Sequence, residues 1–175
     1  MAGSLIKIDE EIVSSAVASV SLTGIDSTYD VYLLIMNNVS PANDNKDLYM
    51  QYIKASDSST DSTANYDYAT KGLLTSLSFQ NNANTNQTQF TLQYARGSAT
   101  NEQDNNLLYL FNTYSSAEYS FYTLEGSGLN FAGGLGSEQG GGAHSVAQSN
   151  SGVKFTWESG GNFASGTFTL YGLAK

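Results

Sequence analysis

The stretch GNFASGTFTLYGLAK, residues 161–175, carries the clearest strand pattern of the chain at its C-terminal end. Phe168 and Leu170 fall on one side of an extended backbone, and two threonines and Tyr171 fall on the other, because successive side chains of a strand alternate. The ends of a chain are usually frayed unless they pair with another element. We therefore expect this segment to pair inside a sheet and to close it.

Strand-like alternation recurs through the rest of the chain, and turn-rich segments separate the stretches that carry it. The run VYLLIM at 31–36 is almost entirely apolar, which is typical of a central strand buried on both faces. The expected strands are 16–23, 31–36, 48–54, 88–94, 107–112, 118–125, 153–158 and 167–171, with a weaker candidate at 143–148.

No segment has the pattern of an amphipathic helix long enough to connect parallel strands, and one short helical turn within 62–74 is the only helical candidate. The pattern predicts a single all-β domain over residues 1–175: an antiparallel, jelly-roll-like β-sandwich of eight to nine strands with long polar loops. A closed barrel is less favoured because its strands alternate all round, unlike 31–36. The loops expected to be long and exposed are 55–65, 80–87 and 133–144.

The inward-facing positions of these strands define the expected core, because a sheet with one buried face places its apolar residues there. The expected core residues are Leu22, Leu34, Met50, Phe90, Leu92, Phe111, Phe121, Phe155, Trp157, Phe168 and Leu170.

The composition of the 175-residue, 18.7 kDa chain excludes several classes of function. A formal net charge of −9 argues against binding nucleic acid or an anionic membrane, because both require a basic surface. The absence of cysteine excludes disulfides and thiolate zinc sites. The N-terminus MAGSLIKIDEE has no signal-peptide pattern, so we expect a soluble protein made without a secretion signal.

The sequence offers weak candidates for catalysis. His144 is the only histidine and follows three glycines, and no GxSxG motif supplies a serine nucleophile, so we interpret it as an ordinary residue of a loop or strand edge. Glu118, Glu125 and Glu158 lie at expected strand ends, where paired carboxylates of a glycosidase or ordinary surface charges would both be found. The segment NDNKD lacks the spacing of a calcium loop. We expect no enzyme activity, no cofactor and no metal.

The N-terminal segment SLIKIDEEIV is apolar but has neither the strand rhythm of the other segments nor a full helical pattern. One interpretation is a first edge strand that packs on its own subunit. The other is an arm, within residues 1–13, that docks on a neighbouring subunit or on a larger assembly. The residues that would make this contact are Leu5, Ile6, Ile8, Ile12 and Val13.

Four stretches resemble a family of virion structural proteins of tailed bacteriophages, most closely those of marine and freshwater cyanobacterial phages. They are SSAVASVSLTGIDSTYDVYLLIMNNV (14–39), DSTANYDYATKGL (61–73), NLLYLFNTYSSAEYSFYTLE (106–125) and GVKFTWESGGNFASGTFTLYGLAK (152–175). NFASGTFTLYGL is the most specific of these pieces, and TGIDSTYDVYLL is the next. The resemblance implies a small all-β protein on the virion surface, head or tail, made in the host cytoplasm. It implies no catalytic residues.

Three functions remain open on this basis. The first is a capsid decoration (cement) protein, which the absence of a coiled-coil, collagen-like or β-helical shaft favours. It would bind the major capsid protein and form a homo-oligomer, for which a trimer is one option. The second is a tail-fibre or receptor-binding tip component that contacts other tail components and a host-surface glycan through its polar loops. The third, least favoured, is a sugar-cleaving enzyme of the virion.

Overall fold

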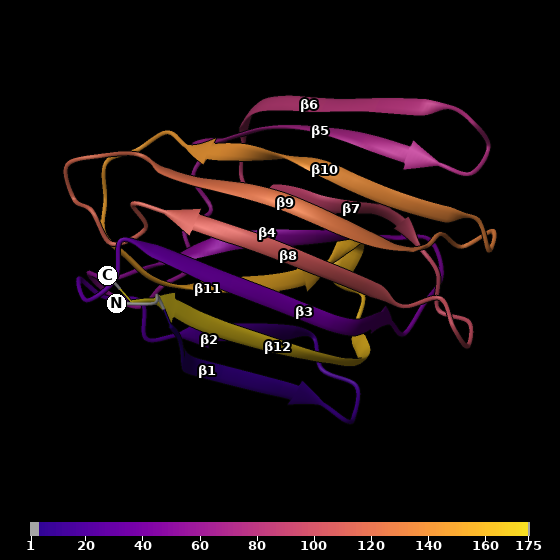
Figure 1. Cartoon of the computed structure of the whole chain (residues 1–175), viewed down its shortest axis with the longest axis horizontal. Helices are drawn as coiled ribbons and strands as arrows, with labels where there is room; N and C mark the ends of the chain where they lie inside the picture. The colour runs from indigo at the N-terminus through magenta and orange to yellow at the C-terminus, as the bar shows by residue number, and fades with distance from the viewer. Residues whose placement is uncertain (1–3, 175) are drawn as a thin grey trace.

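The computed structural model describes residues 4–174 as a sandwich of two antiparallel β-sheets (Figure 1). Within these residues no helix is long and apolar enough to cross a membrane. The eight-stranded sheet has the order β1 (Leu5–Val13), β12 (Phe163–Leu173), β3 (Val31–Pro41), β8 (Asp104–Phe111), β9 (Ser120–Leu129), β10 (Leu135–His144), β5 (Tyr66–Leu74) and β6 (Phe79–Gln87). The four-stranded sheet has the order β2 (Ser19–Thr23), β11 (Asn150–Trp157), β4 (Lys46–Lys54) and β7 (Phe90–Arg96), and a short 3₁₀ turn, η1 (Glu158–Gly160), follows β11.

The C-terminal strand β12 lies inside the large sheet, paired with β1 on one side and β3 on the other. This confirms the prediction made from its alternation. The two ends of the described chain meet at this place, because the backbone N–H of Ala174 donates to the carbonyl of Ser4 at 3.0 Å. Figure 1 shows both ends side by side at the same corner of the molecule.

The strands wrap between the sheets in the manner of a jelly roll. The pair β3/β12 in the large sheet continues as the pair β4/β11 in the small sheet, since β4 follows β3 and β12 follows β11 along the chain. All these pairings are antiparallel. The predicted β-sandwich class is therefore confirmed, with twelve strands instead of eight to nine.

The additional strands come from segments whose sequence predicted something else. β5 covers most of the segment expected to hold a helical turn, and β6 and β10 occupy the segments expected as exposed loops at 80–87 and 133–144. The expected strand at 143–148 is wrong, because β10 ends at His144. Only the loop at 55–65 stays outside the strands, as predicted.

The core between the sheets contains nine of the eleven expected residues, each 2% exposed or less. Phe111 and Phe121 are the two errors: Phe111 is half-buried and Phe121 is 43% exposed on the outer face of the large sheet. Phe121 and Tyr122 are adjacent in β9, so their rings point to opposite faces of the sheet. Tyr122 and Leu124 are the residues that point into the core.

The two sheets differ in width, and this determines what is exposed. β7, the last strand of the small sheet, packs beneath β5, β9 and β10. β6 extends beyond β7, so that seven of its nine residues are exposed and the other two are half-buried. The small sheet covers only the inner face of the large one, and the outer face of the large sheet has no element packed on it among residues 4–174.

Candidate functional site

The outer face of the large sheet carries a band of bulky apolar side chains that we call the ridge. It consists of Leu33 and Ile35 on β3, Leu107 and Tyr109 on β8, and Phe121 on β9. Leu107, Tyr109 and Phe121 are each more than 40% exposed. Clusters of exposed apolar residues on a soluble protein commonly mark interaction sites.

Beside the ridge lies a hollow whose floor is made of small residues, which we call the trough. It consists of Gly141 and Ala143 on β10, Ala69 on β5 and Ala83 on β6, and it belongs to a shallow hollow of about 820 Å³. A side chain at Gly141 would meet the carbonyl oxygen of Tyr122 at 2.4 Å. The close approach of β9 therefore requires glycine at this position, and no side chain of residue 141 protrudes into the trough.

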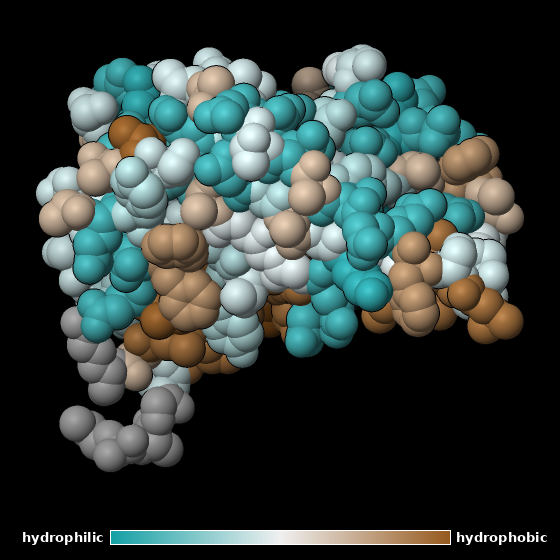
Figure 2. Space-filling model, turned by 90° about the horizontal axis from the view of Figure 1, so that it is seen from above, coloured by the Kyte–Doolittle hydropathy of each residue, from teal (hydrophilic) through white to brown (hydrophobic). Residues whose placement is uncertain are grey.

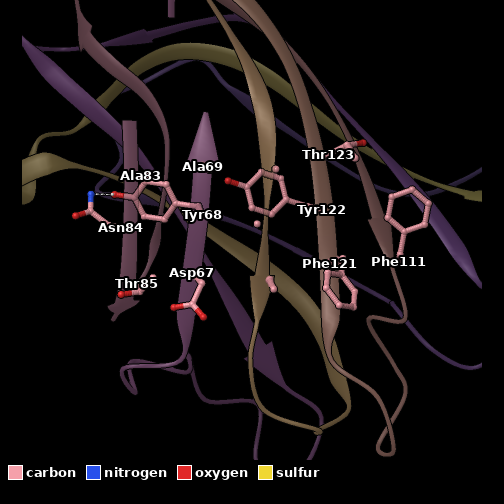
Figure 3. Close-up of a pocket in the computed structure, with 13 residues that line it drawn as sticks. Asp67, Tyr68, Ala69, Ala83, Asn84, Thr85, Phe111, Phe121, Tyr122 and Thr123 are labelled. Carbon is pink, nitrogen blue, oxygen red and sulfur yellow. Dashed lines mark hydrogen bonds between the residues drawn. The ribbon is translucent and has the colours of Figure 1, made fainter. Parts of the chain in front are cut away.

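The figures show how the ridge and the trough are placed. In Figure 3 the rings of Phe111 and Phe121 lie together on the β8–β9 side of the hollow, and Asp67 and Thr85 lie on the β5–β6 side. Figure 2 looks onto the β5–β6 edge, which is mostly hydrophilic, with hydrophobic residues along the lower margin, where the outer face of the large sheet comes into view. The face is therefore apolar in its middle and polar at its β6 edge.

His144 was interpreted from the sequence as an ordinary residue of a loop or strand edge, and the structure places it in the interior instead. It ends β10 and is fully buried, with its ring centroid 4.6 Å from that of Tyr66 and 5.2 Å from that of Tyr52. Its Nε2 lies 3.1 Å from Oδ2 of Asp61. Burial lowers the pKa of His144, although the neighbouring Asp61 carboxylate acts in the opposite direction.

Asp61 is held in place by three hydrogen bonds from Thr63 and Gln148. Its Oδ1 accepts from the backbone N–H of Thr63 at 2.9 Å and from the Thr63 hydroxyl at 2.6 Å, and its Oδ2 accepts from Gln148 at 2.8 Å. Ser120 is opposite His144 in the sheet but is also fully buried, with its hydroxyl bonded to Asn150. The His144–Asp61 pair therefore supports the loop 55–65 and has no accessible nucleophile beside it.

A second group of buried charges joins the edge of the small sheet to the large sheet. Arg96 on β7 places Nε 3.3 Å from Oδ1 of Asp104 on β8, and its Nη1 donates to the carbonyl of Gly136 at 3.3 Å. Arg96 also donates to the Gln93 side chain, which in turn donates to Asn106. Burial raises the pKa of Asp104 to about 7, and Arg96 partly opposes this shift.

Glycines on β9 and β10 make room for this group. A Cβ at Gly126 or Gly128 would collide with the side chain of Asn106 or of Asp104 respectively. Glu138 lies nearby on β10, 2% exposed, and burial raises its pKa. Asp104 and Glu138 are both closed off from solvent between the sheets.

The three glutamates considered for glycosidase chemistry are not brought together. Glu125 lies on the outer face of β9, Glu118 lies in the loop before β9, and Glu158 lies in η1 after the small-sheet strand β11. Among the described residues no cluster of three or more histidine or acidic side chains could hold a metal ion. The buried carboxylates that the structure does bring together carried no periodic signal in the sequence, because they occupy inward positions otherwise taken by apolar residues.

The five N-terminal contact residues divide into two groups. β1 is the edge strand of the large sheet, with Leu5, Ile6 and Ile12 exposed, the last at 66%. Ile8 is half-buried against the core and Val13 is buried, so these two serve their own subunit. Met1–Gly3 of the expected arm lie outside the described residues.

The two stretches TGIDSTYDVYLL and NFASGTFTLYGL, on which the expected resemblance chiefly rests, contact each other. In TGIDSTYDVYLL, Tyr32 donates its hydroxyl to the carbonyl of Asp26 at 2.6 Å and accepts from the Asp26 N–H at 2.9 Å. The Tyr29 ring covers Gly172 of NFASGTFTLYGL so closely that a Cβ at Gly172 would overlap it. Both stretches therefore stabilise the joint between the β2–β3 loop and β12.

Comparisons with known proteins give no further assignment. No protein-family model matches the chain, and no match was found among curated proteins or solved structures.

Proposed function

We propose that the protein is a structural component of a tailed-phage virion and, within it, a decoration protein on the outer surface of the head. It would be made in the host cytoplasm and would bind the major capsid protein as a homo-oligomer. The observation that carries the proposal is the exposed, nearly uncharged ridge on the outer face of a rigid sandwich. Assembly proteins need such a surface, whereas the buried polar groups of this chain have no opening for a substrate.

The sequence resemblance supports the virion as the location. The segments that carry it, 14–39 and 152–175, build β2, β3, β11 and β12, and these strands join the two sheets. A protein that shares them with phage virion proteins would share their framework. A fold framework alone does not define a function, so the location requires a direct test.

The first test is to locate and count the protein in purified particles of the phage that encodes it. Antibody labelling viewed by electron microscopy should mark the head, and quantitative mass spectrometry should give a copy number comparable to that of the major capsid protein. Label confined to the tail, with few copies per particle, would contradict the decoration role. Absence of the protein from purified particles would contradict any virion role.

The exposed apolar residues of β1 are the proposed contact with the capsid. Replacing Leu5, Ile6 and Ile12 with serine should weaken binding to undecorated particles by about tenfold or more, because side chains of this kind each lose about 1.5–3 kcal/mol of burial on average. The melting temperature should change little, since exposed substitutions usually alter stability by about 0.5 kcal/mol or less. Binding is measured by co-sedimentation with particles.

A matched control uses three apolar residues that are also exposed but lie away from β1. Leu77, Phe79 and Phe131 are 92%, 65% and 48% exposed, and β6 is the opposite edge strand of the same sheet. Their serine variant should bind particles as the unmodified protein does. Equal binding by both triple variants would show that β1 is not the contact.

A tail-fibre or receptor-binding tip remains the alternative, and one feature favours it. The β2–β3 and β8–β9 loops enclose a hollow of about 490 Å³ at one end of the sandwich, lined by Tyr29, Tyr114, Asn112 and Glu118 among others. Aromatic rings beside amides and carboxylates suit a host-surface glycan. Localisation to the tail, together with binding of the purified protein to host cell-wall polysaccharide, would favour this role over decoration.

A further inference from the structure

The ridge and the trough lie next to each other on one face, in the same cross-strand rows. Phe121 on β9 is directly opposite Ala143 on β10. In the next row Tyr109 is opposite Thr123, Thr123 is opposite Gly141, and the row continues through Ala69 to Ala83. In these two rows the residues from β3 to β9 are large and apolar except Thr123, and the residues from β10 to β6 are small except Asp67, which follows Ala143 on β5.

This arrangement is self-complementary about one particular axis. Consider a two-fold axis that runs between β9 and β10, nearly parallel to the strands. Rotation about this axis leaves the position of each residue along the strand direction unchanged. It exchanges β9 with β10, β8 with β5, and β3 with β6. We infer that a second copy of this chain covers the face in this way, so that the ridge of each copy fills the trough of the other.

The predicted contacts follow from the register of the strands. Phe121 of one copy lies over Ala143 of the second copy, and Tyr109 lies over Ala69. Leu33, which is only 7% exposed in its own subunit, lies over Ala83. Each of these places a large apolar side chain on a small one. Two sheets pack in this face-to-face manner with their strands about 30° apart and their backbones about 10 Å apart, which requires small residues opposite large ones.

The axis brings no two like charges together, although it places Asp67, which shares a row with Ala143 and Phe121, over the Phe111 ring of the second copy. Glu125, Gln139 and Lys71 occupy one row on β9, β10 and β5. The axis places Glu125 over Gln139, and Leu107 of the same row over Lys71. No two like charges of this row are brought together, although each copy has a net charge of −9.

The size of the face is sufficient for a stable dimer. Six strands with five spacings of about 4.8 Å, each strand about seven residues long, cover roughly 24 Å by 23 Å. The pair of copies would then bury on the order of 1,100 Å², which reaches the approximately 1,000 Å² that a specific interface needs. An interface about a two-fold axis closes with two copies and leaves β1 free in each.

The inference extends the proposed assembly role by naming its partner, but it is tested with purified protein alone and can fail while the virion location holds. Light scattering after size exclusion should give twice the 18.7 kDa mass of the chain at micromolar concentration. Sedimentation over a dilution series then gives the dissociation constant.

Substitutions at Leu107 and Lys71 test the register of the interface. These positions lie on β8 and β5, which are separated by two strands within one copy, and they meet only across the axis. Leu107→Lys should raise the dissociation constant about tenfold or more through like-charge repulsion against Lys71. Leu107→Lys combined with Lys71→Glu should restore dimerisation to within a few-fold of the unmodified protein, and Lys71→Glu alone serves as the reference.

A matched control separates the interface from general effects of charge. Leu77→Lys introduces the same residue at an exposed leucine in the β5–β6 turn and should leave the dissociation constant unchanged. Unchanged far-UV circular dichroism and melting temperature in Leu107→Lys exclude a failure to fold. The proposal is overturned if the protein is a monomer at all concentrations, if it is a trimer, or if Leu107→Lys/Lys71→Glu does not recover. A monomer would leave the face to another virion protein or a glycan.

Discussion

His144, the single histidine of the chain, lies inside the sandwich beside Asp61, where burial and a neighbouring charge both affect its pKa. The His144 ring packs against Tyr66 and Tyr52, tilted by 41° and 48° to them, and its Nε2 lies 3.1 Å from the Asp61 carboxylate. Taking a charged imidazolium out of water costs free energy, so burial lowers the pKa of His144. The neutral form of the His144 imidazole is therefore favoured in the folded protein.

The stability of the protein should depend on pH through His144. As pH falls below about 6.5, the unfolded chain binds a proton on His144 that the folded chain does not yet bind, so the free energy of unfolding decreases. His144→Gln lacks this contribution. The stability difference between the unmodified protein and His144→Gln, measured by urea unfolding, should therefore be smaller at about pH 5.5 than at about pH 7.5. A larger difference at the lower pH would show that His144 is protonated in the folded state.

Gly128 should tolerate no side chain, because Asp104 occupies the space that a Cβ needs. A Cβ there would also lie 2.7 Å from the carbonyl oxygen of Gln103. Gly128→Ala should lower the free energy of unfolding by about 2 kcal/mol or more through displacement of the buried Arg96–Asp104 pair. Ser127→Ala, one residue earlier and facing solvent, is the control and should change stability by about 0.5 kcal/mol or less.

At the scale of the strand, the sequence predicts those elements that have one apolar and one polar face. β4, β7, β8 and β12 alternate in sequence, and each was predicted within a few residues. In β8 the core lies on one side only, whereas in β7 the polar Thr91 and Gln93 are buried as well. β6 could not be predicted, since FQNNANTNQ lies beyond the small sheet and has no buried face to create a pattern. β10 could not be predicted either, because its sequence LGSEQGGGAH has four glycines and few apolar side chains. Backbone hydrogen bonding to β5 and β9 on its two sides forms the strand.

The candidate site was missed for a related reason. Phe121 was expected in the core as an inward-facing position of the strand expected at 118–125, and only the register with Ala143 reveals that it faces outward. The ridge is assembled from β3, β8 and β9, which no local pattern combines. The edge position of β1, by contrast, was one of the two interpretations that its sequence allowed.

Phe168 on β12 tests the strand that closes the large sheet. It is fully buried against Phe155 and Phe163, with ring centroids 5.4 and 5.5 Å away. Phe168→Ala should lower the free energy of unfolding by about 3–5 kcal/mol, since it leaves a cavity between the sheets. Thr167→Ala on the opposite face of β12 is the control, and chemical denaturation measures both. A loss below about 1 kcal/mol for Phe168→Ala would contradict the packing described here.

At the scale of the whole molecule, the unequal width of the two sheets leaves one broad face without a partner. The eight-stranded sheet covers the four-stranded sheet, and its outer face carries the ridge, the trough and few charges. The net charge of −9 is therefore carried mainly by other parts of the surface. Apolar contact and long-range repulsion act against each other when two copies approach.

Because repulsion between two negatively charged copies opposes the apolar contact, the dissociation constant of the dimer should depend on the salt concentration. Raising the sodium chloride concentration from about 0.02 M to about 0.5 M shortens the range of electrostatic repulsion from roughly 20 Å to roughly 4 Å. The dissociation constant should therefore decrease as salt is added, and sedimentation measures it. An interface held mainly by salt bridges would weaken instead, and that result would contradict the apolar interface.

The meeting of Ser4 and Ala174 at one corner of the sandwich makes the molecule suitable for circular permutation. Their backbones already share a hydrogen bond, so a short glycine–serine linker would join the old ends without strain. The chain could then be opened at the exposed β5–β6 turn around Leu77, far from the core. Such a rearranged chain would keep every strand pairing, and a protein fused at its new ends would project from the opposite edge of the sheet.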